Sequence, residues 1–562
     1  MSIRLPGSLL LITGFIASMI LSFPLMAGVI AAPKAIAQSA SSVNEVHSDF
    51  NGDGYEDLAI GTIHEDIDGI DSAGAVNVLY GSSFGFQTSS PADQFWHQNS
   101  PSVKDLAEVV DERFGSSLAH GDFNNDGFAD LAIGVPFEDI GSVDNAGAVH
   151  ILYGSVNGLQ ANSPDDQFWN QNSAGLEDLA ENDDYFGYSL ATGDFNADSF
   201  DDLAIGVIGE EVVGTTSEGA VNVLYGSSQG LSTSTAGDST GRVDQLWHQN
   251  SPGVEETSEF LDQFGVSLAA GDFNNDGRDD LAVGVVGESL GSIITGAVNV
   301  LYGSFNGLQV NSPADQLWHQ DSLGVEDANE DGESFGGSLV AGDFNNDEFD
   351  DLAIGNSAEG LGTAFNQGAI TVLYGSSMGL QTTSPADQFW HQNSPSVQDD
   401  AESSDYFGSI MTSGDLNGDG YFDLAIGISS ESILTGGGQE RLRAGAVSVL
   451  YGSASGLQAT SPNDQFWHQN SPGVEDSVGF HEFFGLSVAS GDFNGDGIHD
   501  LAIGVPAEDI GTVSEAGAIN VLYGSLASGL QTSSPVDQLW NQNSAGVNDA
   551  AEEFDSFGHT LS

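Results

Sequence analysis

The sequence contains the pattern Asp-x-Asn-x-Asp seven times, and each copy has a further Asp at its ninth position. Every copy leads directly into the apolar run Asp-Leu-Ala-Ile/Val-Gly. The first residues of successive copies are 73, 72, 78, 71, 72 and 77 positions apart. A unit that recurs seven times at a nearly constant spacing predicts a repeat architecture, in which each unit packs against its neighbours.

Each repeat unit contains four short segments with the composition of β-strands. In the second unit these segments are residues 114–123, 131–135, 147–154 and 166–171. Turn-forming residues separate the segments, and none of them shows a helical period over two turns. Seven units of four strands predict an all-β chain, folded as a seven-bladed β-propeller of four-stranded blades.

The two ends of the chain predict how the ring closes. A Phe-Gly pair opens the first strand of six units, but no such pair precedes the first Asp-rich turn. A seventh pair, Phe557-Gly558, lies near the C-terminus. We therefore predict closure by pairing of the N- and C-terminal segments, with the C-terminal tail supplying the missing strand. Residues 41–48 are the alternative source of that strand, and an open solenoid is the alternative architecture.

Residues 1–37 predict an export signal. Arg4 precedes a long apolar stretch, and Ala35-Ile36-Ala37 provides a cleavage site of small residues. The length of the apolar stretch leaves an uncleaved membrane anchor as the alternative. Residues 38–48 would then be a short lead-in and residues 49–562 the propeller. We expect an exported protein, either secreted, at the cell surface or periplasmic, with no transmembrane span after the signal peptide.

The composition is strongly acidic, with 83 Asp and Glu against 8 Lys and Arg. A net charge of −75 excludes nucleic acid as a partner, because both surfaces are negative. Hydrophobic residues make up 39% of the chain, which is enough for a folded core. The chain has no cysteine, so disulfides cannot stabilise it outside the cell. Bound divalent cations are the expected replacement.

The Asp-rich turns carry the residue types that bind Ca²⁺. Each turn offers side-chain oxygens at positions one, three, five and nine, and a backbone carbonyl at position seven. Oxygen ligands without His or Cys favour calcium over softer metals. The alternative is a set of polar hairpin turns, but three carboxylates within nine residues repel one another without a counter-ion. We predict up to seven structural calcium ions.

The predicted calcium ligands are the residues at positions one, three, five and nine of each turn. They are Asp49, Asn51, Asp53, Asp57, Asp122, Asn124, Asp126, Asp130, Asp194, Asn196, Asp198, Asp202, Asp272, Asn274, Asp276, Asp280, Asp343, Asn345, Asp347, Asp351, Asp415, Asn417, Asp419, Asp423, Asp492, Asn494, Asp496 and Asp500. Gly occupies position six in five turns, whereas Ser199 and Glu348 replace it in the third and fifth. If position six requires a positive φ, these two sites should be strained and weaker.

Three features together resemble FG-GAP repeats, the units of the integrin α-chain N-terminal propeller. They are the Phe-Gly pair, the Asp-rich turn and Gly-Ala-Val before the third strand, and the resemblance covers residues 41–562. It implies calcium in the hairpins between the first and second strands, and ligand contacts by loops of the opposite face. Unlike the integrin propeller, this chain keeps the calcium turn in all seven repeats.

The sequence predicts a binding or adhesion module for an extracellular protein or glycan. The alternatives are a multivalent carbohydrate-binding lectin, a structural component of the cell envelope and, with the least support, a hydrolase. No catalytic motif is present, which predicts that the chain is not an enzyme. Four cations are candidate ligand contacts on the face without metal turns, although they could instead neutralise adjacent acids; they are Lys104, Arg113, Arg441 and Arg443.

Overall fold

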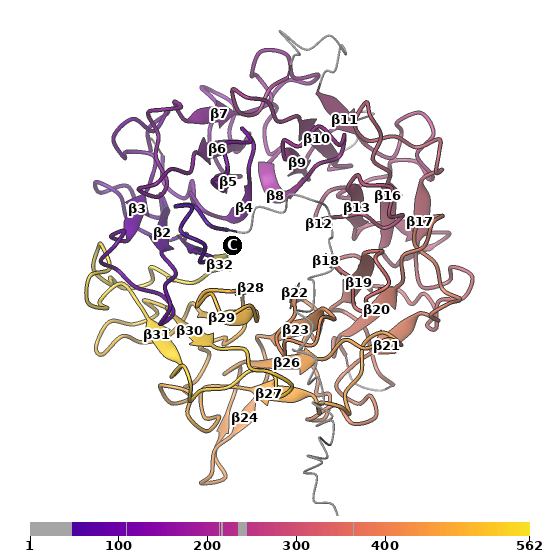
Figure 1. The fold of residues 1–562 in the computed structure, drawn as a ribbon. Helices are drawn as coiled ribbons and strands as arrows, with labels where there is room; N and C mark the ends of the chain where they lie inside the picture. Colours follow the sequence, from indigo (N-terminus) through magenta and orange to yellow (C-terminus); the bar gives the residue numbers. More distant parts are fainter. Residues whose placement is uncertain (1–47, 108, 213, 215–216, 234–243, 363–364) are drawn as a thin grey trace, which may run out of the picture. The chain divides into compact units, whose positions relative to one another are not determined.

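The computed structural model describes residues 48–107, 109–212, 214, 217–233, 244–362 and 365–562 (Figure 1). These residues belong to one compact unit, Ser39–Ser562, and contain no helix. No helix long and apolar enough to cross a membrane occurs among them. The predicted export signal lies outside the described residues, as does the lead-in except for Ser48.

Seven four-stranded antiparallel sheets follow one another around a ring, which confirms the predicted seven-bladed β-propeller (Figure 1). In six sheets the strands pair in chain order, from the innermost strand outwards. The innermost strands are β4 (Ser117–Gly121), β8 (Phe186–Gly193), β12 (Leu268–Gly271), β18 (Ser338–Gly342), β22 (Ile410–Gly414), β28 (Val488–Gly491) and β32 (Thr560–Leu561). The second strands are β1 (Leu58–Thr62), β5 (Asp130–Val135), β9 (Asp202–Val207), β13 (Asp280–Val285), β19 (Asp351–Asn356), β23 (Asp423–Ile428) and β29 (Asp500–Val505).

The two outer positions of each blade are equally regular. The third strands are β2 (Ala75–Leu79), β6 (Ala148–Leu152), β10 (Ala220–Leu224), β16 (Ala297–Leu301), β20 (Ala369–Leu373), β26 (Ala446–Leu450) and β30 (Ala518–Leu522). The outermost strands are β3 (Gln94–Trp96), β7 (Gln167–Trp169), β11 (Gln245–Trp247), β17 (Gln316–Trp318), β21 (Gln388–Trp390), β27 (Gln465–Trp467) and β31 (Gln538–Trp540). Two additional hairpins lie between second and third strands: β14 (Ser289–Leu290) with β15 (Ile293–Ile294), and β24 (Ile433–Leu434) with β25 (Glu440–Arg441).

The C-terminal tail closes the ring, as predicted. Strand β32 is the innermost strand of the first blade, and it pairs with β1 so that Leu561 lies opposite Ile60. The backbone N–H of Ala59 donates to the carbonyl of Ser562 at 2.8 Å, and the N–H of Ser562 donates back at 3.1 Å. The first blade therefore combines residues from both ends of the propeller.

The first and fourth strands are shorter than the sequence predicts. In the second blade, residues 114–116 precede β4, and the N–H of Phe114 donates to the carbonyl of Ala73 in the neighbouring blade at 2.8 Å. The fourth strand is only three residues long. Its tryptophan, Trp169, is half-buried and packs against the core that the second blade shares with the third.

The hydrophobic core lies between blades. One cluster joins Val76 and Tyr80 of the first blade to Leu131 and Ile133 of the second. The second and third strands are buried along their whole length, which explains their continuous apolar runs. A blade cannot bury these surfaces alone, so the ring is stabilised by contacts between neighbours.

The Phe-Gly and Gly-Ala sequences meet where two blades touch. Gly74 of the first blade has φ +83°, and a Cβ there would lie 2.5 Å from the backbone N and O of Phe114. Gly115 has φ +94°, and its Cβ would lie 2.9 Å from Cγ2 of Val76. Both positions therefore require glycine, because any side chain would push the blades apart.

Gly115→Ala should destabilise the protein more than Gly141→Ala. Both glycines have positive φ, so both substitutions introduce backbone strain, but a Cβ at Gly141 meets no atom within 4 Å. We expect Gly115→Ala to cost about 1–3 kcal/mol more in the free energy of unfolding, measured in urea, because it overpacks the contact between blades. Equal costs for the two variants would contradict this account of the repeat.

Candidate functional site

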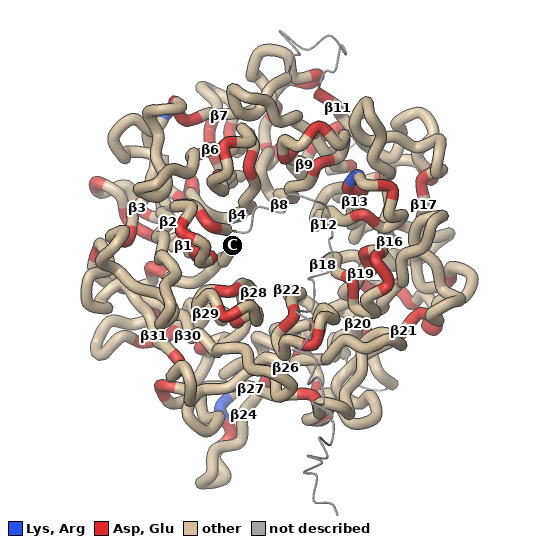
Figure 2. The backbone as a smooth tube through the Cα atoms, in the orientation of Figure 1, with Lys and Arg blue, Asp and Glu red and all other residues tan. Residues whose placement is uncertain are grey.

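The seven Asp-rich turns share one face of the propeller. Each turn joins an innermost strand to a second strand; in the first blade the chain enters the turn directly, and β32 supplies the innermost strand. Because the strands are antiparallel, the connections between third and fourth strands lie on this same face. The other connections lie on the opposite face, which we call the connection face. Acidic segments recur around the whole ring (Figure 2).

The first and fifth positions of a turn accept hydrogen bonds from its own backbone. In the second turn, the Asp122 carboxylate accepts from the N–H groups of Asp126 and Gly127, at 3.0 and 2.8 Å. Oδ1 of Asp126 accepts from the N–H of Phe128 at 3.2 Å. These bonds wind the backbone around the carboxylates and leave the fifth side chain exposed.

The ninth position is the buried centre of each turn. Asp130 is fully buried, and its two oxygens accept from the N–H groups of Gly154 and Phe123, at 2.9 and 3.1 Å. Burial raises its pKa well above the usual range, and the charges of Asp122 and Asp126 raise it further. Burial raises the pKa in the same way at Asp57, Asp202, Asp280, Asp351, Asp423 and Asp500. A nearby cation would allow these carboxyls to ionise.

The third-position asparagine lies against the ninth-position carboxylate. Nδ2 of Asn417 donates to both oxygens of Asp423, at 3.1 and 3.0 Å. Rotating this amide by half a turn would present Oδ1 instead, which is the atom that a metal ion requires. With that rotation, the turn offers only hard oxygen donors, a set that fits Ca²⁺.

The turns are hydrogen-bonded to one another around the ring, which the sequence does not reveal. The residue at position eight donates its N–H to the first-position carbonyl of the preceding turn, as Asp201 does to Asp122 at 3.2 Å. In the same pair, the Asp201 carboxylate accepts the N–H of Asp122 at 2.7 Å. The backbone bond recurs at all seven junctions. A change in the backbone of one turn should therefore affect the next turn through this hydrogen bond.

Position six has a positive φ in every turn, including the two without glycine. The angles are 69° at Ser199 and 74° at Glu348. A side chain in this region costs about 1–2 kcal/mol relative to its preferred backbone conformation. The condition for strained third and fifth sites is therefore met, while their weaker affinity stays a prediction.

A second set of repeated acids lies at the junctions between blades on the connection face, and sequence reasoning missed it. A buried glutamate follows each second strand, and a buried glutamine follows the outermost strand of the preceding blade. At each of the seven junctions, the glutamine amide donates to the glutamate. The glutamates are Glu65, Glu138, Glu210, Glu288, Glu359, Glu431 and Glu508, and the glutamines are Gln98, Gln171, Gln249, Gln320, Gln392, Gln469 and Gln542.

Each of these junctions gathers further carboxylates. Burial raises the pKa of Glu210 to about 8, and the charges of Asp178 and Asp184 contribute to the rise. An acid equivalent to Asp184 lies two residues before each Phe-Gly pair. An acid equivalent to Asp178 lies six or seven residues before that one. The signal was present in the sequence, because each glutamate stands eight residues after the ninth position of its turn.

The four candidate ligand-contacting cations do not form one group. Lys104 and Arg113 lie between β3 and β4, whereas Arg441 and Arg443 lie between β23 and β26, with the seventh blade in between. Nζ of Lys104 lies 3.7 Å from the Asp166 carboxylate, and Arg113 lies 3.9 Å from Asp111. Figure 2 shows the basic segments apart from one another. Their role in binding stays a prediction.

The fold and the repeats define the class of protein to which the chain belongs. A family model described as FG-GAP repeat matches residues 114–152, 186–224, 264–298, 335–373, 407–450 and 484–522. The chain is therefore an FG-GAP repeat protein with an integrin-like propeller, as its sequence motifs predicted.

The similar proteins include enzymes and integrins. Phosphatidylinositol-glycan-specific phospholipase D of Rattus norvegicus is 31% identical over 44% of this chain and 27% of that protein. Integrin alpha-6 of Homo sapiens is 30% identical over 31% of this chain and 13% of that protein. The chain thus matches about a quarter or less of these relatives. The solved structure of rhamnogalacturonan lyase YesW gives a TM-score of 0.38 at 12% identity, over 87% of this chain and 76% of that chain. That of rhamnogalacturonan lyase YesX gives 0.37 at 10% identity, over 86% of this chain and 78% of that chain. Similarities at this level support no conclusion about the function of the chain.

The prediction that the chain is not an enzyme is contradicted by these relatives. A protein named as a phospholipase D shares its repeat region. The prediction relied on the lack of a local catalytic motif, but in a ring of repeats catalytic groups can come from separate blades. The absence of a motif therefore does not test for activity.

Ser199→Gly should stabilise the protein, because glycine removes the strain at position six of the third turn. We expect a gain of about 0.5–1 kcal/mol in the free energy of unfolding, in calcium. Ser83→Gly is the matched control, because Ser83 is exposed and is not among the residues with positive φ. A loss of stability in Ser199→Gly, or an equal gain in both variants, would refute the assignment of strain.

Metal-free protein should become less stable as the pH rises from 5.5 to 8. Burial and neighbouring acids raise the pKa of Glu210 to about 8 and that of Glu431 to about 9, so the folded state binds more protons than the unfolded state above pH 4.5. Stability is therefore lost as these groups ionise. Melting temperatures of dialysed protein without metal should fall over this interval, and a rise would contradict the shifts.

Proposed function

We propose that the chain is an exported, calcium-stabilised propeller that binds an extracellular protein or glycan. The observation that carries the calcium part is the fully buried aspartate at position nine of each turn, as at Asp130, which stands close to two other carboxylates. Calcium would supply the missing positive charge, with Asp ligands at positions one, five and nine and Asn at position three. Residues 1–37 support export.

The expected magnitudes make the calcium structural. Extracellular calcium modules bind with Kd values of about 10⁻⁴–10⁻³ M. At about millimolar calcium, each site would add about 0.4–1.4 kcal/mol to the free energy of unfolding. Seven sites would supply roughly 3–10 kcal/mol, which is comparable to the whole stability of an ordinary domain.

Removal of calcium should lower the melting temperature by about 5–15 °C, because that stabilisation is lost. Differential scanning calorimetry of the full chain with about 2 mM CaCl₂, which exceeds the expected Kd values, and with EGTA measures the difference. Adding excess calcium back is the control for irreversible damage. Identical curves in calcium and in EGTA would overturn the structural role.

The connection face offers exposed side chains that suit a partner. Large apolar residues on it include Phe260, Phe365 and Phe480, which are 62%, 75% and 57% exposed. Cζ of Arg441 lies 4.4 Å from the ring centroid of Phe480, so two neighbouring blades contribute to one aromatic and cationic patch. Aromatic residues and arginine dominate binding energy at protein interfaces.

The double variant Phe480→Ala and Arg441→Ala should weaken partner binding at least tenfold, because it removes this patch. Glycan arrays and a panel of extracellular matrix proteins, both probed in calcium, supply the partner. Phe84→Ala is the matched control, because Phe84 is 82% exposed on the face of the Asp-rich turns. Multivalent glycan binding would favour the lectin alternative. Unchanged affinity of the double variant would refute this surface.

A further inference from the structure

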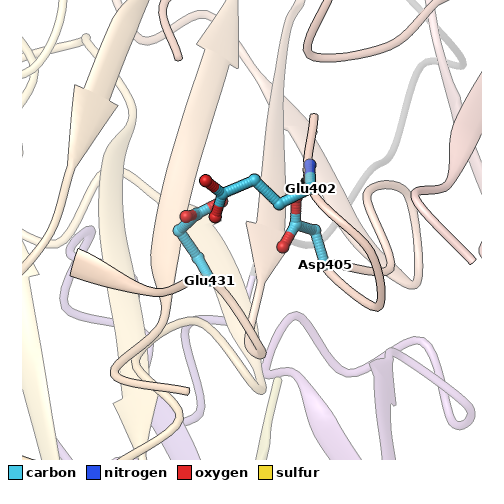
Figure 3. Close-up of side chains that lie close together, drawn as sticks. All are labelled: Glu402, Asp405 and Glu431. Carbon is cyan, nitrogen blue, oxygen red and sulfur yellow. Dashed lines mark hydrogen bonds between the residues drawn. The ribbon is translucent and has the colours of Figure 1, made fainter. Parts of the chain in front are cut away.

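One junction on the connection face brings three carboxylates together at a single point. Glu402 and Asp405 belong to the connection between β21 and β22, and Glu431 follows β23 of the sixth blade. One oxygen from each lies within 4.8 Å of the other two, an arrangement that among the described residues is found here and not in the Asp-rich turns. Figure 3 shows the side chains of Glu402 and Glu431 reaching toward each other beside Asp405.

The spacing of these oxygens matches a hard cation. Calcium binds oxygen at 2.3–2.6 Å, so two of its ligands lie at most about 5 Å apart. Asp405 and Glu431 are each 2% exposed, whereas Glu402 is exposed and opens the cluster to solvent. The site therefore has two fixed ligands and one ligand at the entrance.

A buried polar atom without a partner supports a ligand at this junction. Gln392 is 1% exposed, and its Nε2 donates to Oε2 of Glu431 at 2.7 Å. Its Oε1 accepts no hydrogen bond from the described residues. Rotation of the amide would place this oxygen beside Glu431, where a cation would satisfy it. The unpartnered amide oxygen recurs at the other six junctions, at Gln98, Gln171, Gln249, Gln320, Gln469 and Gln542.

The charged groups around the cluster are acidic, which favours the binding of a cation. The charged groups that act on Glu402 are Asp399, Asp400 and Glu440, all of them acids. Those that act on Glu431 are Asp399, Glu402 and Asp405. Since three carboxylates converge without a basic partner among these groups, the cluster lacks the counter-charge that buried ionised groups require.

We propose that Glu402, Asp405 and Glu431, with the amide oxygen of Gln392, form a calcium site between the fifth and sixth blades. This site is separate from the seven Asp-rich turns and lies on the opposite face. Four protein groups leave room for water to complete the six to eight ligands of Ca²⁺. The absence of His and Cys disfavours zinc. Calcium here would join two blades next to the patch of Arg441 and Phe480.

Calcium titration of the full, metal-free chain tests this site. Isothermal titration calorimetry and equilibrium dialysis with CaCl₂ give the number of bound ions and their affinities. We expect Glu431→Gln to bind one ion fewer than the natural chain, because it removes a charge while keeping an acceptor for Gln392. Glu402→Gln should weaken the binding of that one ion at least tenfold, and because Glu402 is exposed the substitution leaves the packing of the core intact. Glu553→Gln, an exposed acid between β31 and β32 that is not among the groups acting on Glu402 or Glu431, should change neither value.

The outcome is independent of the Asp-rich turns. If those turns bind no calcium, the natural chain still binds an ion that Glu431→Gln lacks. In a variant with Asp419→Asn in the sixth turn, the loss caused by Glu431→Gln should remain one ion. The same ion count and the same affinities in the natural chain, Glu431→Gln and Glu402→Gln would overturn the proposal.

Discussion

The buried aspartate at the ninth position of each turn is the interaction on which the rest of the propeller depends. Asp130 accepts N–H groups from Phe123 in its own turn and from Gly154 after the third strand, so it holds three parts of one blade together. The same carboxylate is costly to bury as an ion, because burial removes its hydrating water and because two acids stand nearby. The carboxylate that accepts these two hydrogen bonds is therefore the same group that needs a positive counter-charge.

The need for a counter-charge at each buried aspartate affects the whole ring, because each turn is hydrogen-bonded to the next. The pairing of Asp201 with Asp122 links the third blade to the second, and equivalent backbone bonds link all the others. The blades also touch where Phe114 packs against Gly74. Since the core lies between blades, separating two of them exposes apolar surface and breaks the turn contacts together. The propeller should therefore unfold as a cooperative unit.

The sequence predicts the architecture well because its signals are local and repeated. The period of the Asp-rich turns indicates seven units, and the unmatched Phe557-Gly558 indicates the closing strand, which β32 confirms. The short first strands could not be predicted, because residues such as Phe114 leave the sheet to contact a different blade.

The features that could not be predicted from the sequence are contacts between residues of adjacent blades. Gln392 and Glu431 are 39 positions apart and belong to adjacent blades, so neither residue reveals the other until the ring is assembled. The eighth-position contacts are hidden for the same reason. The four candidate cations were grouped from their position on a ring, but the structure gives Lys104 and Arg441 separate surroundings. The expectation of no enzymatic activity relied on the lack of local catalytic motifs. Relatives named as phospholipases contradict that expectation.

The most direct test of the account is a crystal structure of the full chain grown in calcium, with anomalous scattering collected to locate the ions. The account predicts anomalous peaks at the Asp-rich turns, each within bonding distance of the residues at positions one, three, five and nine, as at Asp122, Asn124, Asp126 and Asp130. The third-position amides should be rotated so that Oδ1 faces the peak. Turns with this fold but no peak in saturating calcium would contradict the claim that cations neutralise the buried aspartates.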